Sequence, residues 1–475
     1  MDCDLPGRVR IRIERAWLAL RRADAVVAAA YFAVALVSSV LFALLTPPFQ
    51  TPDEHQHFFH AYQIAAGARI EASGRAMGAV LPESLGALAD DYLGSRKVYV
   101  AARGLPRAPV RRILSDLQRP LAESRKTFLD FTGAAPYPAY PYFPQICAIA
   151  VGRAIGAGPL VLLYAARLAN ALVAATVTAA AIFFFPYRRA MLAGFAALPM
   201  ALALFGSLSP DAVLIAGALL LSSLTLRRAA GEGGSRRVYF GVAVLGAAVC
   251  AFKPVYAPLL LIGLPTTLRV RGPVRALLEH GGLVAVAIVA AVAWYGWLAP
   301  PIRVMVPWAD QSRQLTLLLA NPLAGLAVVA NTLRTYGGLL MVQFAGVFGW
   351  LTLAMSPAAY GLVLVGIAAN AAWLTSGQRA EPVDALWALV LFIGVFVLSA
   401  MILYLTWTPV GLDHADGLQG RYFLPAAGLL ATALSSVRRP GPAASPAVTG
   451  AVAVVSLAPI ILALTLITQA YGVFS

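Results

Sequence analysis

The feature that most constrains the fold of this chain is a series of apolar runs, each about long enough to cross a lipid bilayer. A spanning helix needs about 20 predominantly apolar residues. The first run covers residues 24–45. The others lie near residues 160–184, 189–208, 210–227, 238–252, 254–268, 281–299, 357–375, 385–407, 422–436 and 448–470. We therefore expect an all-α polytopic membrane protein, a bundle of about 11 transmembrane helices.

The composition excludes several other classes of protein. Only 12% of the 475 residues are charged, whereas soluble domains carry about 25%. This excludes an ordinary soluble globule and a disordered chain. The net charge of +15 does not require a nucleic-acid partner, because Lys and Arg collect in the cytoplasmic loops of membrane proteins. Cys3, Cys147 and Cys250 are too few and too scattered for a disulfide framework or a zinc site.

The distribution of basic residues sets the expected orientation. Six arginines precede the first run, and further arginines follow the second, fourth and sixth runs. The positive-inside rule then places the N-terminus in the cytoplasm and the C-terminus outside. This holds only if residues 142–157, which include Arg153, form an interfacial or re-entrant helix on the outer side. The first run ends in Thr-Pro-Pro rather than at a small-residue cleavage site, which predicts a retained helix.

These assignments divide the chain into four regions. Residues 1–23 form a basic cytoplasmic tail, and residues 24–299 form an N-terminal transmembrane module. This module includes a large first extracytoplasmic loop, 46–141, for which we expect interfacial helices. The loop carries 11 basic and 9 acidic residues and is too long for a passive connector. Residues 300–356 form a second outer loop, and 357–475 contain the C-terminal transmembrane helices.

The densest group of polar residues follows the first run, at 51–62. Thr51 and Glu54 have the spacing of a capping box, with a proline at the first helical position. Glu54 is therefore either a helix cap or a catalytic carboxylate, whereas the capping box does not require Asp53. Asp53, His57 and His60 would share one helix face, where they could hold a general base or a metal ligand. Against a metal site, the sequence offers no second complete metal-ligand motif beside these residues.

Four further ionisable residues lie in or beside apolar runs, where charge is costly and often functional. Asp211 follows Ser209-Pro210, a pattern that a helix cap alone would also explain. Lys253 either extends to the interface or holds a phosphate. Arg421 could clamp a phosphate through two hydrogen bonds. Arg167 lies within a predicted span and needs a partner, for which Asp211 or a lipid phosphate would serve.

Several short motifs recur in an order that resembles a known family. They are Pro-Asp-Glu-x-x-His at 52–57, residues 140–145, Arg-Leu-Ala-Asn at 167–170, Ser-Pro-Asp at 209–211, Lys-Pro at 253–254, 346–350 and 417–425. The first outer loop resembles that of GT-C glycosyltransferases. More narrowly, residues 31–430 resemble the bacterial membrane family called domain of unknown function 2142.

The resemblance implies a GT-C-like bundle in the bacterial cytoplasmic membrane and an inverting glycosyltransferase that works at its outer face. The donor would be a sugar on a polyprenyl phosphate, and the acceptor a glycan, lipid or protein of the cell envelope. By this resemblance Asp53, and with it Glu54, acts as general base or metal partner, and Asp211 is the second acidic residue. The resemblance leaves a divalent metal open as a cofactor, with Asp53 and His57 as the candidate ligands.

The resemblance also assigns the substrate-binding residues. Lipid A aminoarabinose transferases hold the donor phosphate with a lysine before a short helix, but residues 140–144 contain none. Phosphate binding then falls to Lys253, Arg167 and Arg421. His57, Tyr140 and Gln145 complete the predicted substrate-binding set.

Two other functions remain open at this stage. A transporter or flippase of lipid-linked saccharides would need charged sites near the middle of the membrane and paired broken helices. All 21 acidic residues lie in predicted loops or near the ends of runs, which disfavours coupled transport. A polysaccharide polymerase could share the large outer loop.

Overall fold

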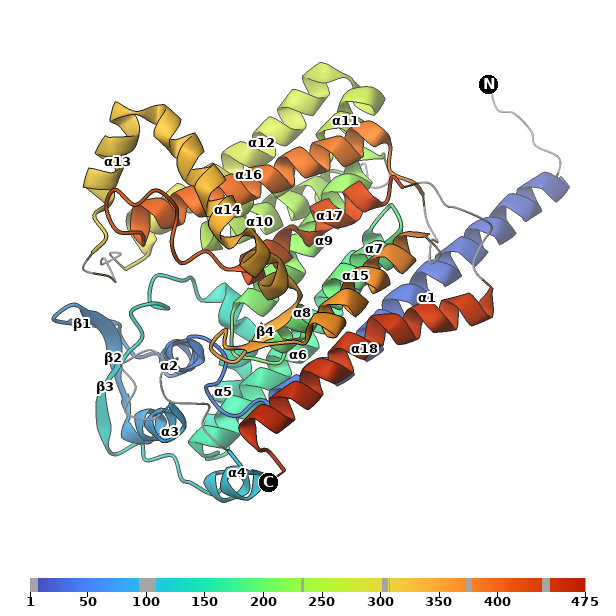
Figure 1. The fold of residues 1–475 in the computed structure, drawn as a ribbon. Helices are drawn as coiled ribbons and strands as arrows, with labels where there is room; N and C mark the ends of the chain where they lie inside the picture. Colours follow the sequence, from blue (N-terminus) through green and yellow to red (C-terminus); the bar gives the residue numbers. More distant parts are fainter. Residues whose placement is uncertain are drawn as a thin grey trace.

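The computed structural model describes residues 7–93, 108–231, 235–300, 306, 308–372, 378–437 and 445–474, with backbone only for 7–24 and 446. Helices make up most of this part of the chain (Figure 1). Cys147 and Cys250 are both free thiols, while Cys3 lies outside the described residues. The side chains of the six tail arginines lie outside them as well.

Six described helices are long and apolar enough to cross a membrane. They are α1 (Gly7–Leu45), α6 (Pro159–Phe184), α9 (Asp211–Ala229), α12 (Pro273–Ala293) with its extension η4 (Trp294–Leu298), α16 (Pro382–Thr406) and α18 (Pro446–Tyr471). The count rises to seven if one bent helix pair forms a single span. The chain is thus a multi-pass helical membrane protein, and the expected count of about 11 spans is not confirmed.

Prolines explain most of the difference in count. Three expected spans are each broken into two short helices: α7 (Arg189–Ala196) and α8 (Pro199–Phe205), η3 (Pro254–Leu261) and α11 (Leu264–Arg271), and η5 (Gly420–Ala426) and α17 (Ala427–Leu434). Proline lacks an N–H and clashes with the preceding turn, so it interrupts a helix without lowering the hydropathy of the run. Two others, α10 (Arg236–Phe252) and α15 (Pro357–Ala372), are unbroken but have only 17 and 16 residues.

The 46–141 loop is a small folded unit with its own core. It contains α2 (Glu54–Ala65), β1 (Glu71–Ser73), β2 (Ala76–Pro82), α3 (Glu83–Leu93), α4 (Val110–Asp116), β3 (Lys126–Asp130) and η2 (Tyr140–Tyr142). The strands form an antiparallel sheet in the order β1-β2-β3, with Gly78 opposite Asp130. Phe49, Phe58 and Phe131 are fully buried between this unit and the start of α6. We had expected helices here but not a sheet.

The next helix, α5 (Phe143–Ala154), packs against α2 and α6. Its 12 residues are too few to cross a bilayer. This length is compatible with the interfacial or re-entrant helix that we expect at residues 142–157.

The segment 300–356, which we expected to be an outer loop, is largely helical. It holds α13 (Gln311–Ala320) and α14 (Pro322–Gly346), followed by the short strands β4 (Val347–Phe348) and β5 (Leu353–Ala354). The two helices meet at an angle of 111°. Pro322 begins the second helix and Asn321 is extended, which accounts for the bend. The pair is either one broken span or a re-entrant segment.

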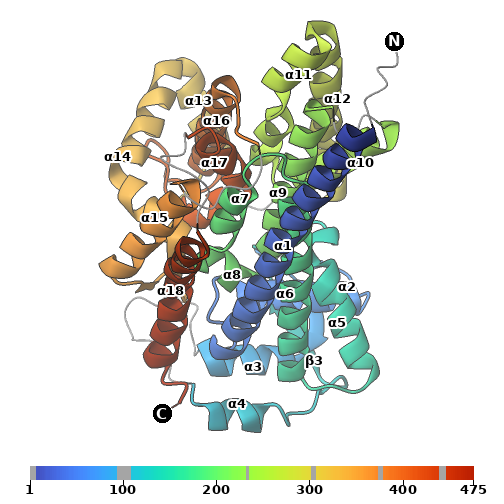
Figure 2. The ribbon, with the colours of Figure 1, turned by 90° about the vertical axis from the view of Figure 1, so that its right-hand side faces the viewer.

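Different parts of the chain lie at the two ends of the helix bundle (Figure 2). The elements of the 46–141 unit gather at one end, and the beginning of α1 and the α11–α12 connection lie at the other. The C-terminal end of α18 returns to this unit, since the Ala108 and Val110 N–H groups donate to the carbonyls of Tyr471 and Val473 at 3.1 and 3.0 Å. The C-terminus therefore lies on the same side as the 46–141 unit.

Candidate functional site

An ion pair between Asp211 and Lys253 forms the centre of the candidate site. Asp211 is the first residue of α9 and follows Pro210, which occupies the N-cap position expected for Ser209; the Ser209 hydroxyl accepts a hydrogen bond from the Asp211 N–H at 3.2 Å. Lys253 ends α10, where Pro254 interrupts the helix. The Lys253 Nζ lies 2.6 Å from Asp211 Oδ1, and both side chains remain partly exposed. Two residues that the sequence singled out separately are therefore direct partners.

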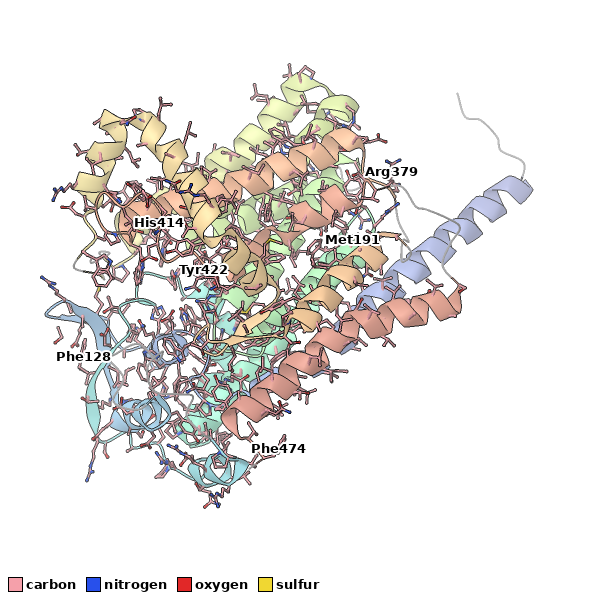
Figure 3. The ribbon with its side chains drawn as sticks, in the orientation of Figure 1. Phe128, Met191, Arg379, His414, Tyr422 and Phe474 are labelled. Carbon is pink, nitrogen blue, oxygen red and sulfur yellow. The ribbon has the colours of Figure 1, made fainter. Side chains whose placement is uncertain are left out.

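Three aromatic rings surround the Lys253 ammonium group. The distances from Nζ to the ring centroids are 5.9 Å for Tyr137, 5.3 Å for Phe252 and 5.4 Å for Tyr422. Aromatic faces at such distances attract a cation. Tyr137 belongs to the 46–141 unit, while the other two rings come from the bundle, and Figure 3 shows Tyr422 where the two parts meet. The ammonium thus marks the junction between them.

Tyr137 was not among the residues predicted from the sequence. The sequence signal for it is the repetition of Pro and Tyr over residues 136–142, from which only Tyr140 was predicted to bind substrate.

Arg421 is a buried cation beside this ion pair. It is 6% exposed, and its Nε donates to Gln419 Oε1 at 2.7 Å. Its guanidinium carbon lies 5.7 Å from the centre of the Tyr422 ring. It forms no ion pair with any residue in the described part of the chain, although Asp211 and Asp53 lie within electrostatic range. A buried charge without a partner is costly, so this position favours an anionic ligand.

Asp53 presents a carboxylate that the fold does not use. It precedes α2 in the left-handed backbone region, with φ 61°, and it does not cap the helix through its side chain. Among the described residues we find no hydrogen bond or ion pair to this carboxylate. Asp53 lies before the helix rather than on it, so the expected shared face with His57 and His60 is wrong. Asp53 lies within electrostatic range of Arg421 and Tyr137.

The two histidines of α2 are buried against tyrosines. His57 Nδ1 lies 2.8 Å from the Tyr142 hydroxyl, and His60 Nε2 lies 3.3 Å from the Tyr137 carbonyl. Burial lowers the pKa of His57 to about 3 and that of His60 to about 4, so both rings are neutral at pH 7. Within the described ranges no three His, Cys, Asp or Glu side chains are grouped to hold a metal ion. A metal between Asp53 and His57 would therefore need ligands from elsewhere.

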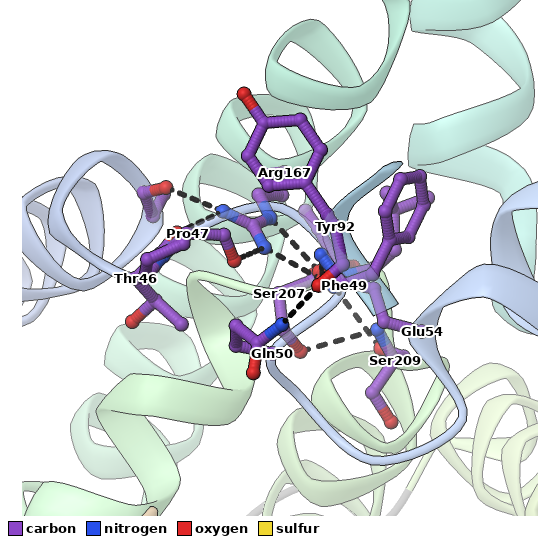
Figure 4. A network of polar contacts seen from close by, with 12 residues as sticks. Thr46, Pro47, Phe49, Gln50, Glu54, Tyr92, Arg167, Ser207 and Ser209 are labelled. Carbon is purple, nitrogen blue, oxygen red and sulfur yellow. Dashed lines mark hydrogen bonds and ion pairs between the residues drawn. The ribbon is translucent and has the colours of Figure 1, made fainter. Parts of the chain in front are cut away.

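Glu54 and Arg167 occupy a different place from the one expected (Figure 4). Both are fully buried, and they pair through Nε–Oε1 at 2.8 Å and Nη2–Oε2 at 2.6 Å. The expected capping box is wrong, because Glu54 accepts from the Phe49 and Leu208 N–H groups instead of the Thr51 N–H. The expected partners of Arg167, Asp211 or a lipid phosphate, are also wrong. The loop that follows α1 folds back over α6 and supplies Glu54.

Tyr140 and Gln145, the remaining predicted substrate-binding residues, have local structural contacts. The Tyr140 hydroxyl donates to the Ala248 carbonyl and so attaches the 46–141 unit to α10. Gln145 is fully buried in α5, with Nε2 3.5 Å from the Leu208 carbonyl. Its Oε1 has no partner among the described residues.

Comparison with protein families gives one match, which covers most of the chain. The family described as "Predicted membrane protein (DUF2142)" matches residues 36–430, so the chain belongs to this family. No curated protein and no solved structure matches it. The family description establishes a membrane protein and assigns no reaction.

Proposed function

We propose that this DUF2142 family member is an inverting glycosyltransferase that takes a sugar from a polyprenyl-phosphate donor at the outer face of the cytoplasmic membrane. The observation that carries the proposal is the buried Arg421, which has no ion pair with any described residue and stands beside the Lys253–Asp211 pair. A phosphate group would supply the missing negative charge. The resemblance to GT-C glycosyltransferases supports the same conclusion by analogy of fold.

In this proposal Lys253 and Arg421 hold the donor phosphate. Together they carry two positive charges, of which Asp211 balances one. Arg421 forms no ion pair with any described residue, so its guanidinium group is available to pair with the single negative charge of a phosphodiester. Lys253 donates one N–H to Asp211 Oδ1, which leaves two for the phosphate. The Tyr137, Phe252 and Tyr422 rings restrict the position of the ammonium group.

Asp53 activates the acceptor in this proposal. Its carboxylate removes the proton from an acceptor hydroxyl while the hydroxyl oxygen forms a bond to the anomeric carbon. The bond from that carbon to the phosphate oxygen breaks at the same time, and the polyprenyl phosphate leaves with the electron pair. Attack opposite the leaving group inverts the anomeric centre. General-base assistance of this kind contributes about 10²–10⁴-fold to the rate.

The test is transfer by the purified protein in lipid nanodiscs from a radiolabelled polyprenyl-phosphate sugar to an envelope extract. The extract comes from cells that lack the gene, so that unmodified acceptor is present. We expect labelled product from the wild-type protein and from Asp90→Asn, an exposed aspartate of α3 that serves as control. Asp53→Asn should give almost none. Movement of the lipid-linked sugar across liposomes without transfer would refute the proposal in favour of a flippase.

A further inference from the structure

We infer that Glu54, Arg167 and Asn170 are positioning residues that fix Asp53 and Asp211 relative to each other. The inference rests on the proposed function, in which both carboxylates serve one reaction. Neither Glu54 nor Arg167 is accessible to a substrate, since both side chains are fully buried. Their effect must therefore pass through the residues that they hold.

Glu54 joins three separate parts of the chain. Besides its two contacts with Arg167, Oε2 accepts from the Phe49 N–H at 3.0 Å and Oε1 accepts from the Leu208 N–H at 3.1 Å. Phe49 and Asp53 both adopt φ 61°, which is unfavourable for residues other than glycine. Such a conformation persists only where its surroundings enforce it. Glu54, directly after Asp53, provides that constraint.

Arg167 uses all five of its N–H groups inside the protein. Two go to Glu54, as described above, and Nη1 donates to the Ala43 and Thr46 carbonyls at 2.8 and 2.7 Å. The fifth, on Nη2, donates to the Pro47 carbonyl at 3.1 Å. These carbonyls end α1 and begin the connection to α2. Arg167 thus ties the connection that carries Asp53 to α6, and it has no N–H left for a donor phosphate.

Asn170 holds the second carboxylate from the same helix face. It follows Arg167 by three residues and therefore lies beside it on α6. Its Nδ2 donates to the Ser207 and Ser209 carbonyls at 2.7 and 3.1 Å. Glu54 binds the N–H of Leu208 between them. The backbone that leads into Asp211 is thus fixed on both sides, which gives the Arg-Leu-Ala-Asn motif at 167–170 a physical role.

The first arm of the test is a double-mutant cycle between Asp53→Asn and Glu54→Gln. Gln places an NH₂ group where one of the buried N–H donors needs an acceptor, so the position of Asp53 should shift. Misplacing a catalytic group by about 1 Å can cost about 10²-fold in rate. We expect Glu54→Gln to lower kcat by about that factor when Asp53 is present, with unchanged donor affinity, and to cause no further loss in the Asp53→Asn background. Equal losses in both backgrounds would show a purely structural role and overturn the inference.

A matched control separates positioning from general destabilisation. Ser222 is fully buried in α9 and donates to the Ala218 carbonyl of its own helix. Ser222→Ala should lower the melting temperature without changing kcat. A loss of kcat in this control that matches its thermal destabilisation would count against the inference.

The second arm does not depend on transferase activity. We would measure the rate at which a thiol reagent labels Asp53→Cys after Cys3, Cys147 and Cys250 are replaced. Adding Glu54→Gln should change that rate severalfold, and an unchanged rate would overturn the inference. If Glu54→Gln does not fold, Asn170→Ala with Asp211→Cys serves as the same test. Full activity of Asp53→Asn would refute the catalytic proposal alone, because labelling still reports on the position of residue 53.

Discussion

Arg167 and Arg421, which are both buried, should respond in opposite ways to the same substitution. Arg→Met removes the guanidinium group and keeps most of the apolar stem. Arg167 donates all five N–H groups to protein acceptors and pairs with Glu54, whereas Arg421 has no ion pair with any described residue. We predict that Arg167→Met destabilises the protein strongly and that Arg421→Met does not.

The magnitudes follow from these contacts. Arg167→Met leaves the Glu54 carboxylate buried and uncompensated, which costs about 3–5 kcal/mol. Arg421→Met loses its hydrogen bond to Gln419, worth about 1.5–3 kcal/mol for a charged donor. It also removes a desolvation cost of several kcal/mol, since Arg421 is buried and forms no ion pair within the described ranges. The unliganded variant should therefore melt at the wild-type temperature or higher.

Donor affinity should show the reverse order. If Arg421 holds the phosphate, its loss removes about 1.5–3 kcal/mol of binding, which weakens the donor about 10- to 150-fold. Arg421→Lys should also bind poorly, because an ammonium group cannot reproduce a two-pronged contact. Arg313→Ala, at an exposed position on α13, should leave donor affinity unchanged.

The assay is scanning fluorimetry in detergent, with and without polyprenyl phosphate, together with a donor titration. A large fall in melting temperature for Arg421→Met, comparable to that for Arg167→Met, would make Arg421 a structural residue. Unchanged donor affinity in Arg421→Met would place the phosphate elsewhere. Either result would refute the reasoning.

Three further predictions follow from the site and the fold. Asp53→Asn should lower the transfer rate by about 10²–10⁴-fold while expression and melting temperature persist; full activity would remove Asp53 from the mechanism. Ser115→Cys, in the 46–141 unit, should react with a membrane-impermeant thiol reagent added from outside the cell, and labelling from the cytoplasmic side alone would invert the proposed orientation. Burial lowers the pKa of His57 from 6.5 to about 3, so the unfolded chain binds this proton first as the pH falls. His57 should therefore reduce stability progressively below about pH 6.5, and a melting temperature independent of pH between 6.5 and 4 would contradict its neutral burial.

The sequence by itself determined the class of protein and the elements that carry the charges. Apolar runs near 20 residues predict spanning helices because the bilayer offers no partners for backbone polar groups. Six described helices meet that criterion, among them the first run and the helix that begins at Asp211. The ordered motifs indicated the family that matches residues 36–430. Both signals are local, since each depends only on neighbouring residues.

Hydropathy alone predicted more spans than the six or seven described helices that are long and apolar enough to cross a membrane. The average hydropathy of a run stays high when Pro199, Pro265 or Pro425 interrupts the helix. The backbone hydrogen bonds that such a proline removes must be replaced by neighbouring segments. Whether such a run spans the membrane or bends within the protein is therefore decided by packing.

Only the tertiary structure decided which charges are partners. Glu54 and Arg167 are 113 residues apart, and Lys253 and Asp211 are 42 apart, so no spacing rule connects them. Thr51 and Glu54 have the spacing of a capping box. Glu54 pairs with Arg167 instead, because leaving that buried arginine without a carboxylate would cost more free energy than a helix cap contributes. Among the described residues Asp53 has no side-chain partner, whereas the neighbouring Glu54 is paired. The local sequence distinguished these two carboxylates only by the capping spacing, but in the folded protein they differ because Glu54 pairs with the buried guanidinium group of Arg167.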